Sequence, residues 1–153
     1  MSTERQEAIG EAGSAMQRYQ RSVQAFDDAV GRALGVGPAD MRCLDWLSDG
    51  ARTAGELAVA TGLRPAATTA LIDRLTERGF VRRVPSPDDR RKVLVELTEE
   101  GRAKVWSAYG PLVDEGGAVF DGVGVAQLRA WSALLDEMTA LTDRHRARIE
   151  ASD

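Results

Sequence analysis

The chain has 153 residues, a net charge of −4 and 29% charged residues, which fits one domain or a small module sharing a core with a second element. One cysteine and one histidine exclude a disulfide framework and argue against a zinc site, which draws on several such ligands. No apolar run reaches membrane-spanning length and residues 1–10 do not resemble a signal peptide, so we expect a cytoplasmic protein with no membrane partner.

The first third of the chain carries one apolar stripe, in which residues recur in steps of three and four. It comprises Ile9, Ala12, Met16, Tyr19, Val23, Phe26, Val30 and Leu34. This spacing predicts one long helix that Gly35 and Gly37 close. Pro38 then opens a second helix over 38–48, and Asp49-Gly50 ends it as a turn.

A pair of helices follows. Thr53-Ala-Gly-Glu56 is a capping box, so a short helix is predicted from there to Thr61-Gly62. The next helix spans about 64–78, with Pro65 in its first turn and Gly79 as its cap. Its inward residues are Leu71, Ile72 and Leu75.

The period then changes to that of strands. Residues 80–84 and 92–97 have strand character, and the Pro- and Asp-rich residues between them predict a turn, so the unit is a β-hairpin. Two helices, about 99–119 and 125–149, complete the chain. Leu128, Trp131, Leu135, Met138 and Leu141 line one face of the last helix. The expected fold class is mainly α with a small β-hairpin wing.

Basic residues are concentrated in one segment of this acidic chain. Eight basic and four acidic residues lie between Arg64 and Lys92, so that segment has a net charge of +4 and the rest of the chain −8. A basic island of this kind suits phosphate binding, although a merely solvated charged face is the alternative that charge leaves open.

The helix pair at 53–78 is a helix-turn-helix candidate, in which the second helix would enter a DNA major groove. Its exposed face is expected to carry Arg64, Pro65, Ala66, Thr68 and Thr69. An arginine on a thin hairpin can enter a narrow minor groove, and a neighbouring carboxylate can orient it through a bidentate pair. The hairpin tip offers Arg90 and Arg91 beside Asp88 and Asp89. Residues 53–98 would therefore form the DNA-reading surface.

Two motifs make a family resemblance specific. The run from Asp89 to Thr98 fits D-x-R-x5-L-T, and the run from Leu71 to Arg83 fits LxxRLxxxGxVxR. Together they resemble the MarR family of bacterial winged helix-turn-helix transcriptional regulators. The motif detail covers about 38–101, and helix order and length extend the resemblance to the whole chain.

The resemblance implies a homodimer that binds double-stranded DNA at a pseudo-palindromic operator. We expect it to act as a repressor, and no cofactor is expected. Residues 1–36 and 99–153 would form an intertwined helical dimerisation region. Residues 37–98 would form the winged helix-turn-helix lobe.

The resemblance also assigns roles on the DNA. Arg91 would be the groove-entering wing residue and Asp89 its orienting partner, with Arg90 as a neighbouring phosphate contact. Further backbone contacts would come from Arg74, Arg83 and Thr53. Ala70 departs from the polar or basic residue common there, and Ala66 and Ala67 offer no donors. Because methyl groups contact thymine, we expect an A·T-rich site that is read partly by shape.

Members of the family respond to small, often aromatic ligands, which bind between the dimerisation helices and the DNA-binding lobe. The candidate lining residues are Tyr19, Phe26, Trp46, Trp106 and Tyr109. The alternative is that they are core or interface aromatics. Cys43 is expected to be a buried structural residue, and His145 a solvated or dimer-contact residue.

Two alternative classes of function remain. An enzyme is disfavoured because the sequence has no nucleophile elbow, phosphate-cradling loop or metal cluster. A winged-helix protein used for DNA architecture or protein contacts would need no specific operator, and the ratio of specific to non-specific DNA affinity distinguishes it from a regulator.

Overall fold

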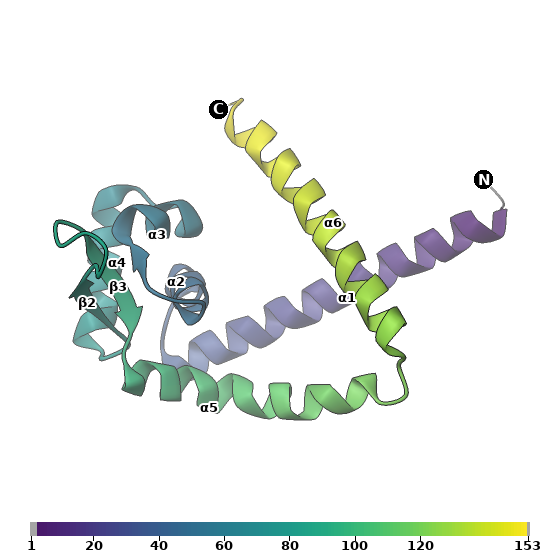
Figure 1. The fold of residues 1–153 in the computed structure, drawn as a ribbon, viewed down its shortest axis with the longest axis horizontal. Coiled ribbons are helices and arrows are strands. Elements are labelled where there is room, and N and C mark those ends of the chain that lie inside the picture. The colour runs from purple at the N-terminus through teal and green to yellow at the C-terminus, as the bar shows by residue number, and fades with distance from the viewer. Residues whose placement is uncertain (1–2, 153) are drawn as a thin grey trace. The chain divides into compact units, whose positions relative to one another are not determined.

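The computed structural model describes residues 3–152, so Met1, Ser2 and Asp153 of the predicted helical region lie outside the described residues. Helices predominate, with one small sheet (Figure 1). The elements are α1 (Thr3–Leu34), α2 (Pro38–Ser48), β1 (Arg52–Thr53), α3 (Ala54–Thr61), α4 (Pro65–Glu77), β2 (Val81–Pro85), β3 (Val93–Leu97), α5 (Glu99–Gly116), the 3-10 helix η1 (Gly117–Phe120) and α6 (Val125–Glu150). The expected fold class is confirmed.

The sheet is antiparallel with strand order β1-β3-β2. β2 and β3 form the predicted hairpin, with Val81 opposite Leu97 and Pro85 opposite Val93. The sequence does not predict β1, because a two-residue strand has no periodicity to detect. β1 pairs Arg52 with Val95 and so joins the start of the helix pair to the hairpin.

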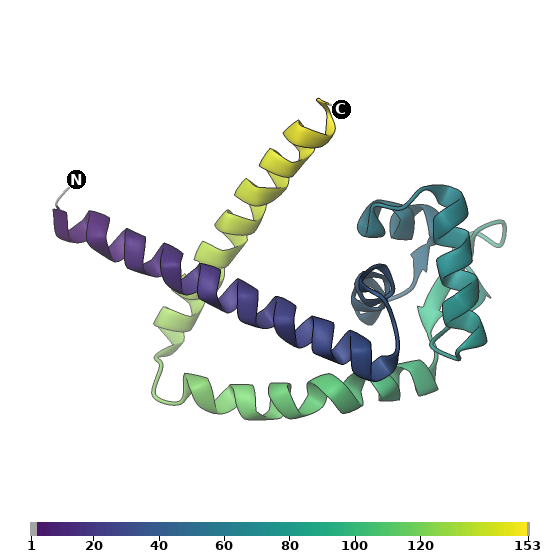
Figure 2. The same ribbon diagram turned by 180° about the vertical axis from the view of Figure 1, so that it is seen from behind.

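The core lies where α2, α3 and α4 pack with the sheet (Figure 2). The predicted inward residues Leu71, Ile72 and Leu75 are buried, as is Leu57 of α3. Phe80, Val81, Val95 and Leu97 complete the core from the sheet side. Burying a side chain of this size contributes about 1.5–3 kcal/mol, so this lobe forms a firm support for an exposed reading surface.

The hairpin is joined to α5 by a tight connection at Thr98. The Thr98 hydroxyl accepts a hydrogen bond from the Gly101 backbone N–H at 2.8 Å and donates one to the Gly79 carbonyl at 2.6 Å. Gly101 is buried, and a Cβ added there would lie 2.1 Å from the Phe80 carbonyl oxygen. Only glycine fits this position without displacing the backbone.

The chain divides into two compact units, one up to Gly110 and one from Pro111. In the second unit Phe120 and Trp131 contact each other, with ring centroids 5.6 Å apart. No described residue of α6 is buried, and Leu134 and Leu141 are about half exposed. None of the helices within residues 3–152 combines the length and the apolar character of a membrane span.

Cys43 lies in the core with none of its surface exposed, as predicted for a structural residue. Burial, helped by the negative charge of Asp40, raises the pKa of its thiol to about 12. Since the thiolate is the reactive form, we expect no reaction of the native protein with Ellman's reagent at about pH 8. One thiol should react fully after unfolding in guanidinium chloride. Stoichiometric reaction of the native protein within minutes would contradict this burial.

Candidate nucleic-acid interface

The helix-turn-helix consists of α3, a turn at Gly62–Arg64 and α4. The predicted capping box starts α3: the Thr53 hydroxyl accepts from the Glu56 N–H at 3.2 Å, and the Glu56 carboxylate accepts from the Thr53 N–H at 2.7 Å. Two hydrogen bonds from Thr53 lower the pKa of Glu56. The bond from the backbone N–H has the larger effect, and the bond from the hydroxyl has the smaller one. Gly62 ends α3 with a φ of 71°, a left-handed conformation that glycine adopts without strain.

The exposed face of α4 differs in one residue from the prediction. Arg64, Pro65, Ala66 and Thr69 are exposed as expected. Thr68 is only 1% exposed and its hydroxyl donates to the Arg64 carbonyl at 3.1 Å, so the prediction that it lies on the exposed face is wrong. Thr68 is buried because it lies three and four residues before Leu71 and Ile72, on the same side of the helix.

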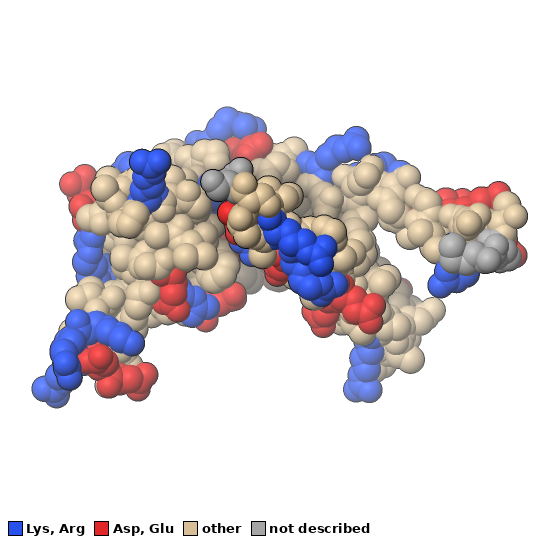
Figure 3. Space-filling model, turned by 90° about the horizontal axis from the view of Figure 1, so that it is seen from above, with Lys and Arg blue, Asp and Glu red and all other residues tan. Residues whose placement is uncertain are grey.

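The tip of the wing is organised by its own side chains. The buried Ser86 hydroxyl lies 3.4 Å from the backbone nitrogens of Asp88 and Asp89, and the Ser86 N–H donates to the Lys92 carbonyl at 2.9 Å. The Arg91 side chain is 97% exposed. A narrow projection with both charge signs is visible at the lower left of Figure 3. The sequence does not single out Ser86, because a serine between two prolines is typical of any turn.

Asp89 acts on Arg91 through the backbone. Its carboxylate accepts a hydrogen bond from the Arg91 N–H at 3.0 Å, whereas the nearest guanidinium nitrogen of Arg91 is 3.9 Å away. The expected bidentate pair is therefore absent between these two residues, and the prediction of that geometry is wrong. The carboxylate fixes the turn from which Arg91 projects and leaves the guanidinium donors available.

Two other predicted phosphate contacts have carboxylate partners within the lobe. Arg74 binds the buried Asp40 at 2.5 Å, and Arg83 binds the exposed Asp73 at 2.7 Å. The second oxygen of Asp40 accepts the Gly37 N–H at 3.0 Å, at the start of α2. Arg74 thus connects α4 to α2, in addition to any contact with DNA.

These two arginines should differ in their effect on stability. We expect Arg74→Ala to cost about 1–3 kcal/mol of unfolding free energy, because it leaves the buried Asp40 carboxylate short of a partner. Arg83→Ala is the matched control and should cost less than about 1 kcal/mol, because its partner is solvated. Urea unfolding at one protein concentration measures the unfolding free energy of both variants. Equal losses of unfolding free energy would show that the Arg74–Asp40 ion pair behaves as a surface ion pair.

Arg78 makes a connection that the sequence does not indicate. Its guanidinium donates to the Leu34 carbonyl at 2.7 Å and also to the Gly35 carbonyl, so it satisfies free carbonyls at the end of α1. These partners are 43 and 44 residues away in the chain, and no local pattern marks such a contact. α4 is therefore connected to the end of α1 through Arg78 and to α2 through the ion pair of Arg74 with Asp40.

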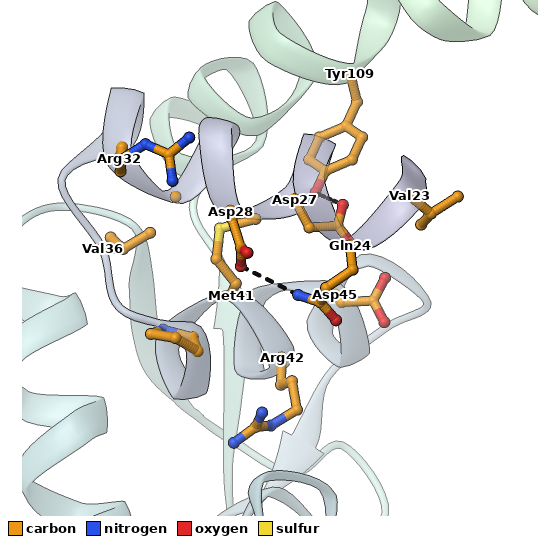
Figure 4. Close-up of a pocket in the computed structure, with 12 residues that line it drawn as sticks. Val23, Gln24, Asp27, Asp28, Arg32, Val36, Met41, Arg42, Asp45 and Tyr109 are labelled. Carbon is orange, nitrogen blue, oxygen red and sulfur yellow. Dashed lines mark hydrogen bonds between the residues drawn. The ribbon is translucent and has the colours of Figure 1, made fainter. Parts of the chain in front are cut away.

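A cleft of about 790 Å³ lies between α1, α2 and Tyr109 of α5 (Figure 4). Of the aromatic residues predicted for a ligand site, only Tyr109 lines it, and Phe26 packs edge-on against Tyr109 with ring centroids 5.4 Å apart. Tyr19, Trp46 and Trp106 are exposed and are not among the residues that line this cleft, so their part in a ligand site stays a prediction.

The Tyr109 hydroxyl donates to an Asp27 carboxylate oxygen at 2.6 Å, and a dashed line in Figure 4 marks this bond. Burial and then this hydrogen bond to Asp27 raise the pKa of Tyr109 above its ordinary value. The hydroxyl therefore stays protonated and remains a hydrogen-bond donor at neutral pH.

A capped helix-turn-helix, a three-stranded wing sheet and a projecting wing arginine together define a winged helix-turn-helix protein. The MarR family model matches residues 34–92. The chain is 30% identical to YhbI of Bacillus subtilis, an uncharacterised HTH-type transcriptional regulator, over 69% of this chain and 73% of the relative. The chain belongs to the MarR family of helix-turn-helix transcriptional regulators.

Two further likenesses agree with this assignment. YcgE of Bacillus subtilis, another uncharacterised HTH-type transcriptional regulator, is 39% identical over 57% of each chain, so the aligned region spans little more than half of that relative. The crystal structure of a MarR family transcriptional regulator from Silicibacter pomeroyi superimposes with a TM-score of 0.63 at 27% identity. The superposition covers 86% of this chain and 90% of that one.

Proposed function

We propose that this protein is a homodimeric repressor that occupies a pseudo-palindromic operator and that a small ligand releases. The observation that carries the proposal is the exposure of Arg91 at the tip of a wing whose base is packed into the helix-turn-helix lobe. Repression follows from occupancy of the DNA. Residues 37–98 would form the reading lobe, and residues 1–36 and 99–153 the dimerisation region.

Contacts with DNA would come from three places. The exposed face of α4, with Arg64, Pro65, Ala66 and Thr69, would enter the major groove. Arg91 would enter the minor groove beside it, with Arg90 on a phosphate. Thr53, Arg74 and Arg83 would contact the backbone, although each already has a partner within the lobe.

The composition of the α4 face bears on the operator. Ala66, Ala67 and Ala70 are exposed and carry only methyl groups, and the Thr69 hydroxyl already donates to the Pro65 carbonyl at 3.1 Å. Few polar groups remain to read base edges. We therefore expect half-sites rich in A·T pairs, which are read by methyl contacts and by groove width. Selection of G·C-rich half-sites from a randomised pool would contradict this expectation.

The uncovered apolar faces of α1 and α6 support dimerisation. In α1 only Val30 and Gly31 of the described residues are buried, while Ile9 and Tyr19 are more than half exposed. In α6 Leu134, Leu141 and Ile149 are exposed. Long amphipathic helices with exposed apolar stripes need a partner surface, and a second copy supplies a self-complementary one.

The decisive experiment compares two affinities at one salt concentration. The protein should bind the intergenic region upstream of its own gene at least about 1,000-fold more tightly than random duplex of equal length. A footprint should show two protected half-sites about one helical turn apart. Light scattering at micromolar concentration should give the mass of a dimer. Equal affinity for both duplexes would indicate an architectural or protein-interaction module instead.

A further inference from the structure

The cleft between α1, α2 and α5 is large enough for a small molecule. Its volume of about 790 Å³ falls in the range of ligand sites in proteins, roughly 300–1,000 Å³. Val23, Val36 and Met41 supply an apolar part of the lining. None of these side chains has a role in the proposed DNA contacts.

The polar part of the lining carries more acidic than basic side chains. It includes Asp27, Asp28 and Asp45, against the two guanidinium groups of Arg32 and Arg42. Asp27 and Asp28 accept hydrogen bonds from neutral donors, the hydroxyl of Tyr109 and the amide of Gln24. Among residues 3–152 no ion pair involves any of the three carboxylates.

Within residues 3–152, neither arginine of the lining forms an ion pair with one of these carboxylates. Arg42 donates to the Thr61 carbonyl at 3.2 Å, and Figure 4 shows its guanidinium directed away from the carboxylates. Partial burial, then the charges of Asp49 and Asp27, raise the pKa of Asp45. Asp27 and Asp45 therefore repel one another, and a positive charge placed between them would be stabilised.

The spacing of the carboxylates favours an organic cation over a metal ion. In the described part of the chain, no three His, Cys, Asp or Glu side chains are close enough to hold a metal. An ammonium group on an apolar body makes use of both the charge and the apolar lining. Its hydrogen bonds to carboxylates would be charge-assisted and about twice as strong as neutral ones.

We propose that this cleft binds a small organic cation, an amine carried on an apolar or aromatic body, with the ammonium group at Asp27 and Asp45. This inference rests on the proposed function, because it names the class of ligand to which the regulator would respond. The apolar body would lie against Val23 and Met41. An anionic ligand of the same shape would bind more weakly, because the carboxylates repel it.

The cleft is connected to the reading helix through α2. Met41, Arg42 and Asp45 line the cleft from α2, and the same helix holds Asp40, the partner of Arg74 on α4. Arg42 also joins the cleft to Thr61, at the end of α3. A ligand that favours one position of α2 over another would thereby change the DNA affinity, by as much as its affinities for the two states differ.

Three indole compounds that differ in charge test the proposal: tryptamine is a cation at neutral pH, tryptophol is neutral and indole-3-acetate is an anion. In isothermal titration calorimetry we expect tryptamine to bind at least about tenfold more tightly than indole-3-acetate, with tryptophol between them. Asp27→Asn and Asp45→Asn should each weaken tryptamine binding about tenfold. Asp136→Asn on α6 is the matched control, because it removes one negative charge outside the cleft, and it should leave the affinity unchanged.

Several results would overturn the cation site. These are no saturable binding of tryptamine up to about 10 mM, tighter binding of indole-3-acetate, or unchanged affinity in both cleft variants. Thermal unfolding of each variant shows whether it is folded, and the amide of Asp27→Asn can still accept the Tyr109 hydroxyl bond. The DNA affinity of the ligand-free protein is measured separately. A lack of specific DNA binding would contradict the proposed function. Specific DNA binding without tryptamine binding would contradict only the cation site in the cleft.

Discussion

Gly101→Ala is expected to destabilise the protein by about 3 kcal/mol, at the upper end of the usual cost of overpacking. The added methyl group would lie 2.1 Å from the Phe80 carbonyl oxygen and under 3 Å from two further backbone atoms of Phe80. The Phe80 carbonyl accepts a hydrogen bond from the Thr98 N–H at 3.0 Å. Phe80 and Gly101 therefore cannot move apart without breaking the connection between the hairpin and α5. The better helix propensity of alanine offsets only about 1 kcal/mol.

Urea unfolding at a fixed protein concentration measures this cost, since the stability of a dimer depends on concentration. Gly116→Ala is the matched control on the same helix, because nothing lies within 4 Å of the added methyl group. It should change the stability by less than about 1 kcal/mol. A Gly101→Ala protein as stable as the control would mean that α5 can move away from the sheet without cost.

Arg91→Ala is expected to weaken operator binding by about 1–3 kcal/mol while leaving the fold unchanged. The side chain is 97% exposed, and its guanidinium makes only a loose ion pair with Asp89 at 3.9 Å within the described lobe, so its removal should cost little stability. Competition titrations against A·T-rich operator and random duplex measure the effect. The ratio of the two affinities should fall, because a groove contact carries sequence information.

Arg90→Ala is the control for charge at the same tip. If Arg90 contacts a phosphate as proposed, its removal should lower the affinity for both duplexes alike and reduce the slope of log K against log salt by about one. If Arg91→Ala leaves the operator affinity unchanged, the wing is not the reader and the α4 face alone must supply specificity.

The ends of the helices are predictable from the sequence, since Pro38, Thr53 and Gly62 act within one turn of the chain. Burial of Leu71 and Ile72 follows from periodicity. The same periodicity places Thr68 on the buried side of the helix beside them. The prediction that Thr68 is exposed relied on its polar hydroxyl and neglected this position.

Contacts between distant segments could not be predicted. Asp40 and Arg74 are 34 residues apart, and Arg78 and Leu34 are 44 apart, so only the packed lobe brings them together. The cleft shows the same limit. Aromatic side chains stand out in the sequence, whereas the carboxylates of the lining look like ordinary solvated residues of α1 and α2.

Because Cys43 is inaccessible, a spectroscopic label can be attached to one introduced cysteine without first replacing the native one. With the one native thiol buried, Glu77→Cys, at an exposed position of α4 outside the proposed DNA contacts, would provide the single site for a nitroxide label. In a dimer the two labels would report the separation of the two α4 helices directly by pulsed electron resonance. Titrating tryptamine or operator DNA into that sample would then show whether either one changes the spacing.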